Sequence, residues 1–80
     1  MVQQDINLET GVWNTIACTG PVLHILSVNN CDISVRFGAN STSQGFEMHP
    51  GDTLSANETV YVKVKREYLK NIPYMISVAR

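Results

Sequence analysis

Residues 22–37 read Val22-Leu23-His24-Ile25-Leu26-Ser27-Val28-Asn29-Asn30-Cys31-Asp32-Ile33-Ser34-Val35-Arg36-Phe37, and this stretch decides the fold. Residues 22–28 are almost continuously apolar, a pattern typical of a central strand that is covered on both faces. We therefore expect Leu26 in the core. Residues 29–32 are polar, and their Asn and Asp side chains tolerate left-handed backbone conformations. Because apolar and polar residues alternate from 33 to 37, the stretch predicts two strands joined as a hairpin.

The same two-residue alternation continues on both sides of this stretch. It predicts further short strands at residues 6–8, 12–18, 46–48, 53–54, 59–65 and 73–79, with a turn at residues 49–52. We expect Trp13 to pack in the core. Helical periodicity is almost absent, and β-branched residues dominate the apolar runs. The chain is therefore predicted to be all-β, a small antiparallel β-sandwich or jelly-roll-like barrel of about seven or eight short strands. Residues 1–80 form a single domain, in which 1–7 could be an N-terminal arm.

The composition is compatible with a protein that binds other proteins. Apolar residues make up 44% of the chain and charged residues 16%, against roughly 25% charged in an average protein. A neutral polar surface is easier to bury in an interface than one rich in Lys and Glu, although a monomer with few charges fits equally well. The net charge is -1, and five of the six basic side chains follow residue 62. Nucleic-acid binding would require a more basic domain.

Two cysteines and the N-terminus bear on localisation. The first residues show no signal-peptide pattern, and no apolar run is long enough to span a membrane. We expect synthesis in the cytoplasm and no membrane association. Cys18 and Cys31 have no companions at metal-ligand spacing, so free buried thiols are predicted. A disulfide formed late, after lysis or export, is left open.

Side chains that could carry chemistry are few. His24 lies within the apolar run and is predicted to be packed or at a strand edge, whereas His49 precedes Pro-Gly and could sense pH. Asp32 and Asp52 are interpreted as turn residues because no alternating oxygen donors surround them. No nucleophile, base and oxyanion donor share a motif. We expect no catalytic residues, no metal, no cofactor and no enzymatic activity.

Three surfaces are candidates for binding a partner. The strand at residues 59–65 places Val60, Val62 and Val64 on one face, so its opposite face should be exposed and can meet a partner. The polar loop 38–44 and the N-terminal segment to Asn7 are the other two. The candidate residues are Tyr61, Lys63 and Lys65 on the strand, Asn40, Ser41, Thr42 and Ser43 in the loop, and Gln3 and Gln4 at the N-terminus.

The order of features over residues 22–64 resembles that of small accessory proteins in the virions of tailed bacteriophages. An apolar strand ends in an Asn-containing turn, and a short strand with Gly, a Ser/Thr-rich loop, Gly with an apolar pair, Pro-Gly-acid and a strand with Val-Tyr follow. In this chain these are Ile25-Leu26-Ser27-Val28-Asn29-Asn30, Val35-Arg36-Phe37-Gly38, Ser41-Thr42-Ser43, Gly45-Phe46-Glu47-Met48, Pro50-Gly51-Asp52 and Thr59-Val60-Tyr61-Val62.

The resemblance implies a β-sandwich protein of the phage head, neck or tail that is oligomeric around a symmetry axis. We expect a homo-oligomer, with a trimer favoured, located in the virion and bound to the major capsid protein or another virion protein. Head decoration, or cement, is the leading function, because many weak contacts to identical neighbours add together. A neck or tail location and a glycan-binding adhesion module are the alternatives.

Overall fold

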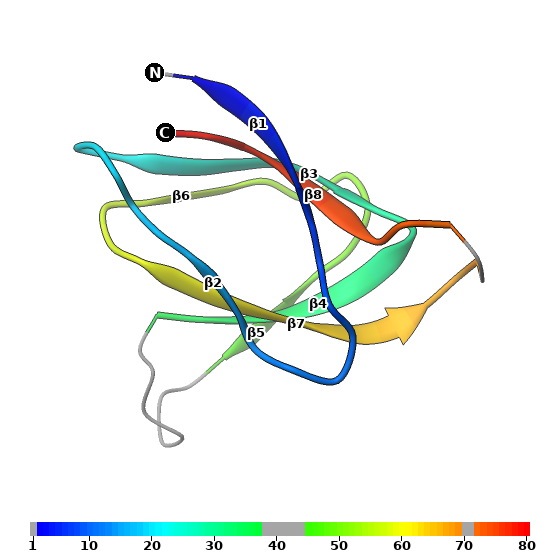
Figure 1. Ribbon diagram of the computed structural model, residues 1–80. Helices are drawn as coiled ribbons and strands as arrows, with labels where there is room; N and C mark the ends of the chain where they lie inside the picture. Colours follow the sequence, from blue (N-terminus) through cyan, green and yellow to red (C-terminus); the bar gives the residue numbers. More distant parts are fainter. Residues whose placement is uncertain (1, 38–44, 70–71) are drawn as a thin grey trace.

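The computed structural model describes residues 2–37, 45–69 and 72–80, and over these ranges it contains eight strands in two antiparallel sheets (Figure 1). The first sheet has the order β1-β8-β3-β6 and the second β2-β7-β4-β5. The strands are β1 (Gln3–Asn7), β2 (Asn14–Ile16), β3 (Leu23–Asn29), β4 (Cys31–Arg36), β5 (Phe46–Met48), β6 (Leu54–Ala56), β7 (Val60–Glu67) and β8 (Met75–Ala79). The prediction of an all-β sandwich is confirmed.

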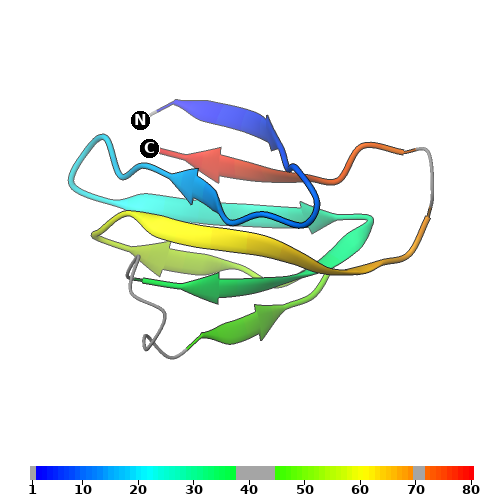
Figure 2. The ribbon, with the colours of Figure 1, turned by 60° about the horizontal axis from the view of Figure 1, so that its bottom comes forward.

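The pairing follows a simple rule along the chain. β1 pairs with β8, β2 with β7, β3 with β6 and β4 with β5, as if one long hairpin had been folded over on itself. β3 also pairs with β8, and β4 with β7, and these contacts join the strand pairs into two four-stranded sheets. This is the strand order of an eight-stranded jelly roll. The two layers face each other in Figure 1, and Figure 2 shows both chain ends together at one side.

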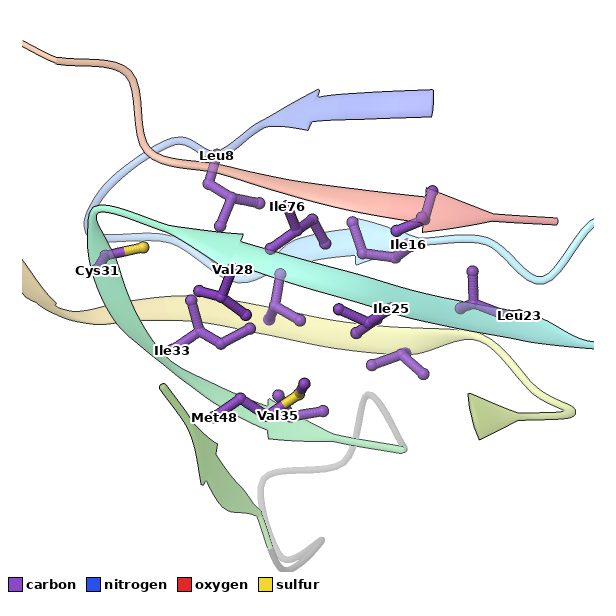
Figure 3. Packing of buried hydrophobic residues seen from close by; sticks show 13 residues of the cluster. Leu8, Ile16, Leu23, Ile25, Val28, Cys31, Ile33, Val35, Met48 and Ile76 are labelled. Atoms are coloured by element: carbon purple, nitrogen blue, oxygen red, sulfur yellow. The ribbon is translucent and has the colours of Figure 1, made fainter. Parts of the chain in front are cut away.

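The core lies between the two sheets (Figure 3). Side chains from both layers point into it because residues two apart along a strand share a face. Burial of this apolar surface is the main source of stability in a domain of this size. The fully or almost fully buried apolar residues are Leu8, Ile16, Leu23, Ile25, Val28, Cys31, Ile33, Val35, Met48, Val60, Val62, Ile76 and Val78.

Strand β3 is central in its sheet, but the prediction that both of its faces are covered was wrong. Leu23, Ile25 and Val28 are buried, whereas Leu26 is 39% exposed. The register with β8 shifts between Ile25 and Ser27. This bulge inserts one residue and bends the strand, so that Val28 enters the core in place of Ser27. Leu26 follows the buried Ile25 and faces outward, and the expectation that it packs in the core is corrected.

The predicted hairpin between residues 22–28 and 33–37 was also wrong. β3 and β4 belong to different sheets, so the segment between them turns a corner across the sandwich. Asn30 forms this corner with a positive φ of 64°, a left-handed conformation that Asn adopts more readily than most residues. The predicted tolerance for left-handed backbone is thus used for a change of sheet.

Several other local predictions are confirmed. Residues 49–52 form a turn in which the Asp52 amide donates to the His49 carbonyl at 2.9 Å, and Gly51 has a φ of 99°. That φ suits glycine, which has no Cβ. The strand predicted at 12–18 is shorter, since β2 covers only Asn14–Ile16. Residues 3–7, considered above as an arm, form β1 and pair along their length with β8.

The two cysteines are free thiols and lie far apart. Ile16, two residues before Cys18, pairs with Val60 at the start of β7, and Cys31 pairs with Glu67 at its end. With about 3.3 Å per residue, the length of β7 separates them, so the late disulfide does not fit this fold. Burial raises the pKa of the Cys31 thiol to about 11.

Candidate binding surface

The outward side of the β2-β7-β4-β5 sheet brings together the side chains that the sequence assigned to β7. Tyr61 lies opposite Thr15 and Arg36, and Lys63 lies opposite Ser34. We call this surface the charged face. It consists of Trp13, Thr15, Ser34, Arg36, Glu47, Tyr61, Lys63 and Lys65.

Trp13 lies on the charged face, which corrects the prediction that it packs in the core. Ile16 points inward from β2, so the residues one and three positions earlier point outward. The guanidinium carbon of Arg36 lies 3.9 Å from the centroid of the Trp13 ring, and the Lys63 Nζ lies 6.0 Å from it. The negative ring face attracts both cations. Trp13 thus connects β2 to β4 across β7.

Arg36 and Lys63 have no carboxylate partner. All seven Asp and Glu side chains fall within the described residues, and the two ion pairs formed there involve Lys65 and His49. The Nε of Arg36 is moreover buried and has no hydrogen-bond partner within the described part of the chain. Buried polar groups are normally paired. The charged face therefore offers two cations beside two aromatic rings to an anionic group of a partner.

Lys65 differs from Lys63 although both project outward from β7. Its ammonium group pairs with the carboxylate of Glu47, which lies on β5. The hydrogen bond and the charge of Lys65 lower the pKa of Glu47. Of the two predicted lysines, Lys63 is therefore the more available to a partner.

A second polar cluster lies at one end of β4. Asp32 is buried, and its carboxylate accepts hydrogen bonds from the Tyr68 hydroxyl and from Nδ1 of His49, the latter at 2.8 Å. The interpretation of Asp32 as a turn residue was wrong, because it belongs to β4 and fastens two distant segments to that strand. Asp52 does act in a turn, where its carboxylate accepts from the His49 amide at 2.8 Å.

The cluster shifts the pKa values of its members in opposite directions. The hydrogen bond from Tyr68, followed by that from His49, lowers the pKa of Asp32. The bond to Asp32, helped by its negative charge, raises the pKa of His49, whose side chain is 53% exposed. His49 therefore sits where a change of pH alters a contact between segments.

The remaining predicted residues are dispersed. Gln3 and Gln4 are exposed on β1, and the Gln4 side-chain oxygen accepts from the Arg80 Nε at 3.0 Å. Asn40, Ser41, Thr42 and Ser43 fall outside the described residues. His24 is a half-buried residue of β3 whose Nδ1 lies 2.7 Å from the Ser55 hydroxyl, as expected for a packed histidine.

Sequence reasoning missed the Trp13–Arg36 contact. Arg36 alternates with core residues in β4, and the two residues are 23 positions apart, so no local pattern relates them. Among residues 2–37, 45–69 and 72–80, no three His, Cys, Asp or Glu side chains are placed to hold a metal ion, and no pocket is found. The described residues also contain no helix long and apolar enough to cross a membrane.

Comparison with known protein families, curated proteins and solved structures finds no match to this chain.

Proposed function

We propose that this chain is a structural protein of a bacteriophage virion, and that it acts as a head decoration or cement protein. In this role it binds neighbouring subunits of the major capsid protein and stabilises the head through many repeated contacts. It acts as a homo-oligomer. The charged face makes the contact, with Trp13, Arg36, Tyr61 and Lys63 at its centre.

One observation carries this proposal: the charged face presents Arg36 and Lys63 beside Trp13 without any carboxylate of the chain to neutralise them. Arg, Trp and Tyr are the residues most enriched among those that dominate binding energy in protein interfaces. A partner that supplies carboxylates would pair with the two cations and cover the rings. The face thus has residue types that are common in interface cores, and its two cations lack a negatively charged partner.

The fold and the sequence resemblance support the same function. Eight-stranded jelly rolls occur in viral capsid proteins and in lectins, and this chain has that strand order. A shared fold does not establish a shared activity, so the fold supports the role of the charged face and does not replace it. The resemblance over residues 22–64 points to the virion in particular.

A glycan-binding adhesion module at the neck or tail is the second candidate. Tyr61 and Trp13 lie on the same face, and aromatic rings can stack on sugars. In this structure, however, the Arg36 guanidinium already occupies a position over the Trp13 ring. A sugar would have to displace that cation or use Tyr61 alone, so the protein-binding function is favoured.

The copy number of the chain in purified virions tests the proposal. Quantitative mass spectrometry against the major capsid protein should give a number that is a simple fraction of the capsid subunit count. A few copies per particle would contradict decoration and favour the neck or tail. Absence from the particle would overturn the virion role altogether.

A pair of variants tests the face. Tyr61→Ala combined with Lys63→Glu should abolish binding to capsids that lack the chain, while circular dichroism shows an intact fold. Lys65→Gln is the matched control on the same strand, and it should bind almost normally because Lys65 is already paired with Glu47. Equal binding by the double variant and the wild type would remove this face from the interface.

A further inference from the structure

Strand β1 is the longest edge strand of the sandwich. It has five residues, whereas the other three edge strands, β2, β5 and β6, have three each. Proline and lysine, which protect many natural edges from pairing with another chain, are absent from it. An edge of this length without such protection is a template for a further strand.

The hydrogen bonds at the end of β1 show which backbone groups are free. Val2 and Arg80 exchange two bonds, from amide to carbonyl, of 3.0 and 3.1 Å. In an antiparallel pair such bonded positions alternate with positions whose backbone groups point the other way. The N–H and C=O groups of Gln3, Asp5 and Asn7 therefore point away from β8, towards the open edge.

These outward groups have no partner in the chain itself. Within the described residues, no backbone or side-chain group bonds to the amide or carbonyl of Gln3, Asp5 or Asn7. All three side chains are exposed, so no other segment covers them. The Asp5 carboxylate instead accepts a hydrogen bond from the Ser77 hydroxyl at 2.6 Å, which holds it over its own sheet.

We propose that the β1 edge pairs with β1 of a second copy of this chain, in antiparallel orientation about a two-fold axis. The two four-stranded sheets then join into one continuous sheet of eight strands. Because each β1 offers both donors and acceptors, the contact is self-complementary, as a two-fold interface requires. This pairing needs only the chain itself and is independent of the virion role. It gives a dimer, and not the trimer that the sequence suggested.

Charge disfavours the register in which the two β1 strands overlap fully, and the register that we propose is shifted by two residues towards the N-terminus. Asp5 opposite Asp5 of the second copy would place like charges side by side, which is unfavourable. Moving the register by two residues sets Asp5 opposite Gln3 of the second copy, and Gln3 opposite Asp5, in two hydrogen-bonded pairs. The Gln3 amide can then donate to the opposing carboxylate. Gln4 meets its own counterpart at the two-fold axis.

Sedimentation equilibrium on the full chain tests the proposal. The mass should rise with concentration from 8.9 kDa to twice that value. Gln3→Glu places a like charge opposite Asp5 twice and should weaken the dimer roughly five- to tenfold, whereas Gln3→Lys should strengthen it. Thr53→Glu, the same charge change at an exposed position away from β1, should have no effect.

Amide hydrogen exchange identifies the edge directly. On going from dilute to concentrated protein, the amides of Gln3 and Asp5 should become protected, whereas the Gln4 amide, already bonded to β8, should not change. A monomer at all concentrations would overturn the proposal. A dimer or trimer would also overturn it if the amides of Gln3 and Asp5 gained no protection on association and both Gln3 variants associated as the wild type does. Neither result depends on finding the chain in virions.

Discussion

The two outer faces of the sandwich differ although the sheets beneath them share one core. The outward side of the β1-β8-β3-β6 sheet, which we call the neutral face, carries mostly uncharged side chains. The charged face carries aromatic rings and most of the cations of β4 and β7. The neutral face consists of Gln3, Asp5, Asn7, His24, Leu26, Ser27, Asn29, Ser55, Met75, Ser77 and Ala79.

The difference lies in what each face leaves unpaired. On the neutral face, polar side chains bond to one another, as Ser77 does to Asp5 and His24 to Ser55. On the charged face, Arg36 and Lys63 find only an aromatic ring. A group already bonded within the chain gains little from a partner, because binding must first break that bond. The charged face is therefore the better candidate for recognition of another protein.

The largest effect should come from the boundary between core and neutral face, at two adjacent residues of β3. Ile25→Ala should cost about 2–5 kcal/mol, since it leaves a cavity in a packed core. Leu26→Ala should cost about 1 kcal/mol or less, because a side chain that is 39% exposed already contacts water. Urea unfolding of both variants measures the difference.

The next two residues, Ser27 and Val28, test the bulge in β3. In a regular strand Ile25 and Leu26 would still face opposite ways, but Ser27 and not Val28 would then follow Ile25 into the core. Val28→Ala should therefore be severe as well, with Ser27→Ala nearly neutral. If Leu26→Ala proved as costly as Ile25→Ala, the outward position of Leu26 would be wrong.

The next largest effect concerns Trp13 on the charged face. Trp13→Ala should cost about 1–2 kcal/mol, because it removes a cation–π contact of about 0.5–1 kcal/mol together with partly buried ring surface. Trp13→Phe keeps a ring beneath the cation and should recover part of that loss. Thermal unfolding at low and high salt checks this order. If Trp13→Ala left the thermal stability unchanged, the contact with Arg36 would contribute nothing to folding.

Much of the fold could be predicted from the sequence because burial on one face of a strand leaves a two-residue pattern. Val60, Val62 and Val64 alternate cleanly, and β7 was found there. The pattern failed at β3, where apolar residues at both 25 and 26 suggested burial on both faces. A strand with a bulge can have the same local sequence, and the bulge is visible only in the register with the partner strand.

The candidate site was predicted less well because its contacts join distant strands. Tyr61 and Lys63 could be assigned to an exposed face from β7 alone. Their neighbours could not, since Trp13 and Arg36 reach them through the pairing of β2 and β4 with β7. The interpretation of Asp32 was wrong for the same reason. Its polarity suggested a turn, whereas Tyr68 and His49 donate hydrogen bonds to its carboxylate within a strand.

A smaller effect should follow from pH at the cluster of Asp32, His49 and Tyr68. The raised pKa of His49 contributes stability that is complete below its usual 6.5 and is lost as the pH rises through the folded value. The lowered pKa of Asp32 contributes stability that is complete above its usual 3.8 and is lost as the pH falls through the folded value. Stability from this cluster should therefore be greatest between about 3.8 and 6.5.

His49→Gln isolates the alkaline side of this profile. The variant cannot gain a proton, so its free energy of unfolding should approach that of the wild type as the pH rises from 6 to 9. The negative charges of Asp52 and Glu47 also face His49 and favour its charged form. A constant difference between the two proteins across this range would mean that His49 acts by packing alone.

The smallest effect should come from the second ion pair, between Lys65 and Glu47 on the charged face. The two side chains are 52% and 43% exposed, so water and salt screen their attraction and holding both in place costs side-chain entropy. Lys65→Gln should therefore leave the urea midpoint unchanged within error. Asp32→Asn breaks a contact to a carboxylate that is only 5% exposed, and it should lower the midpoint measurably. If the two variants were equally destabilised, burial would not be what separates the two ion pairs, and the charge of the face itself would have to contribute to folding.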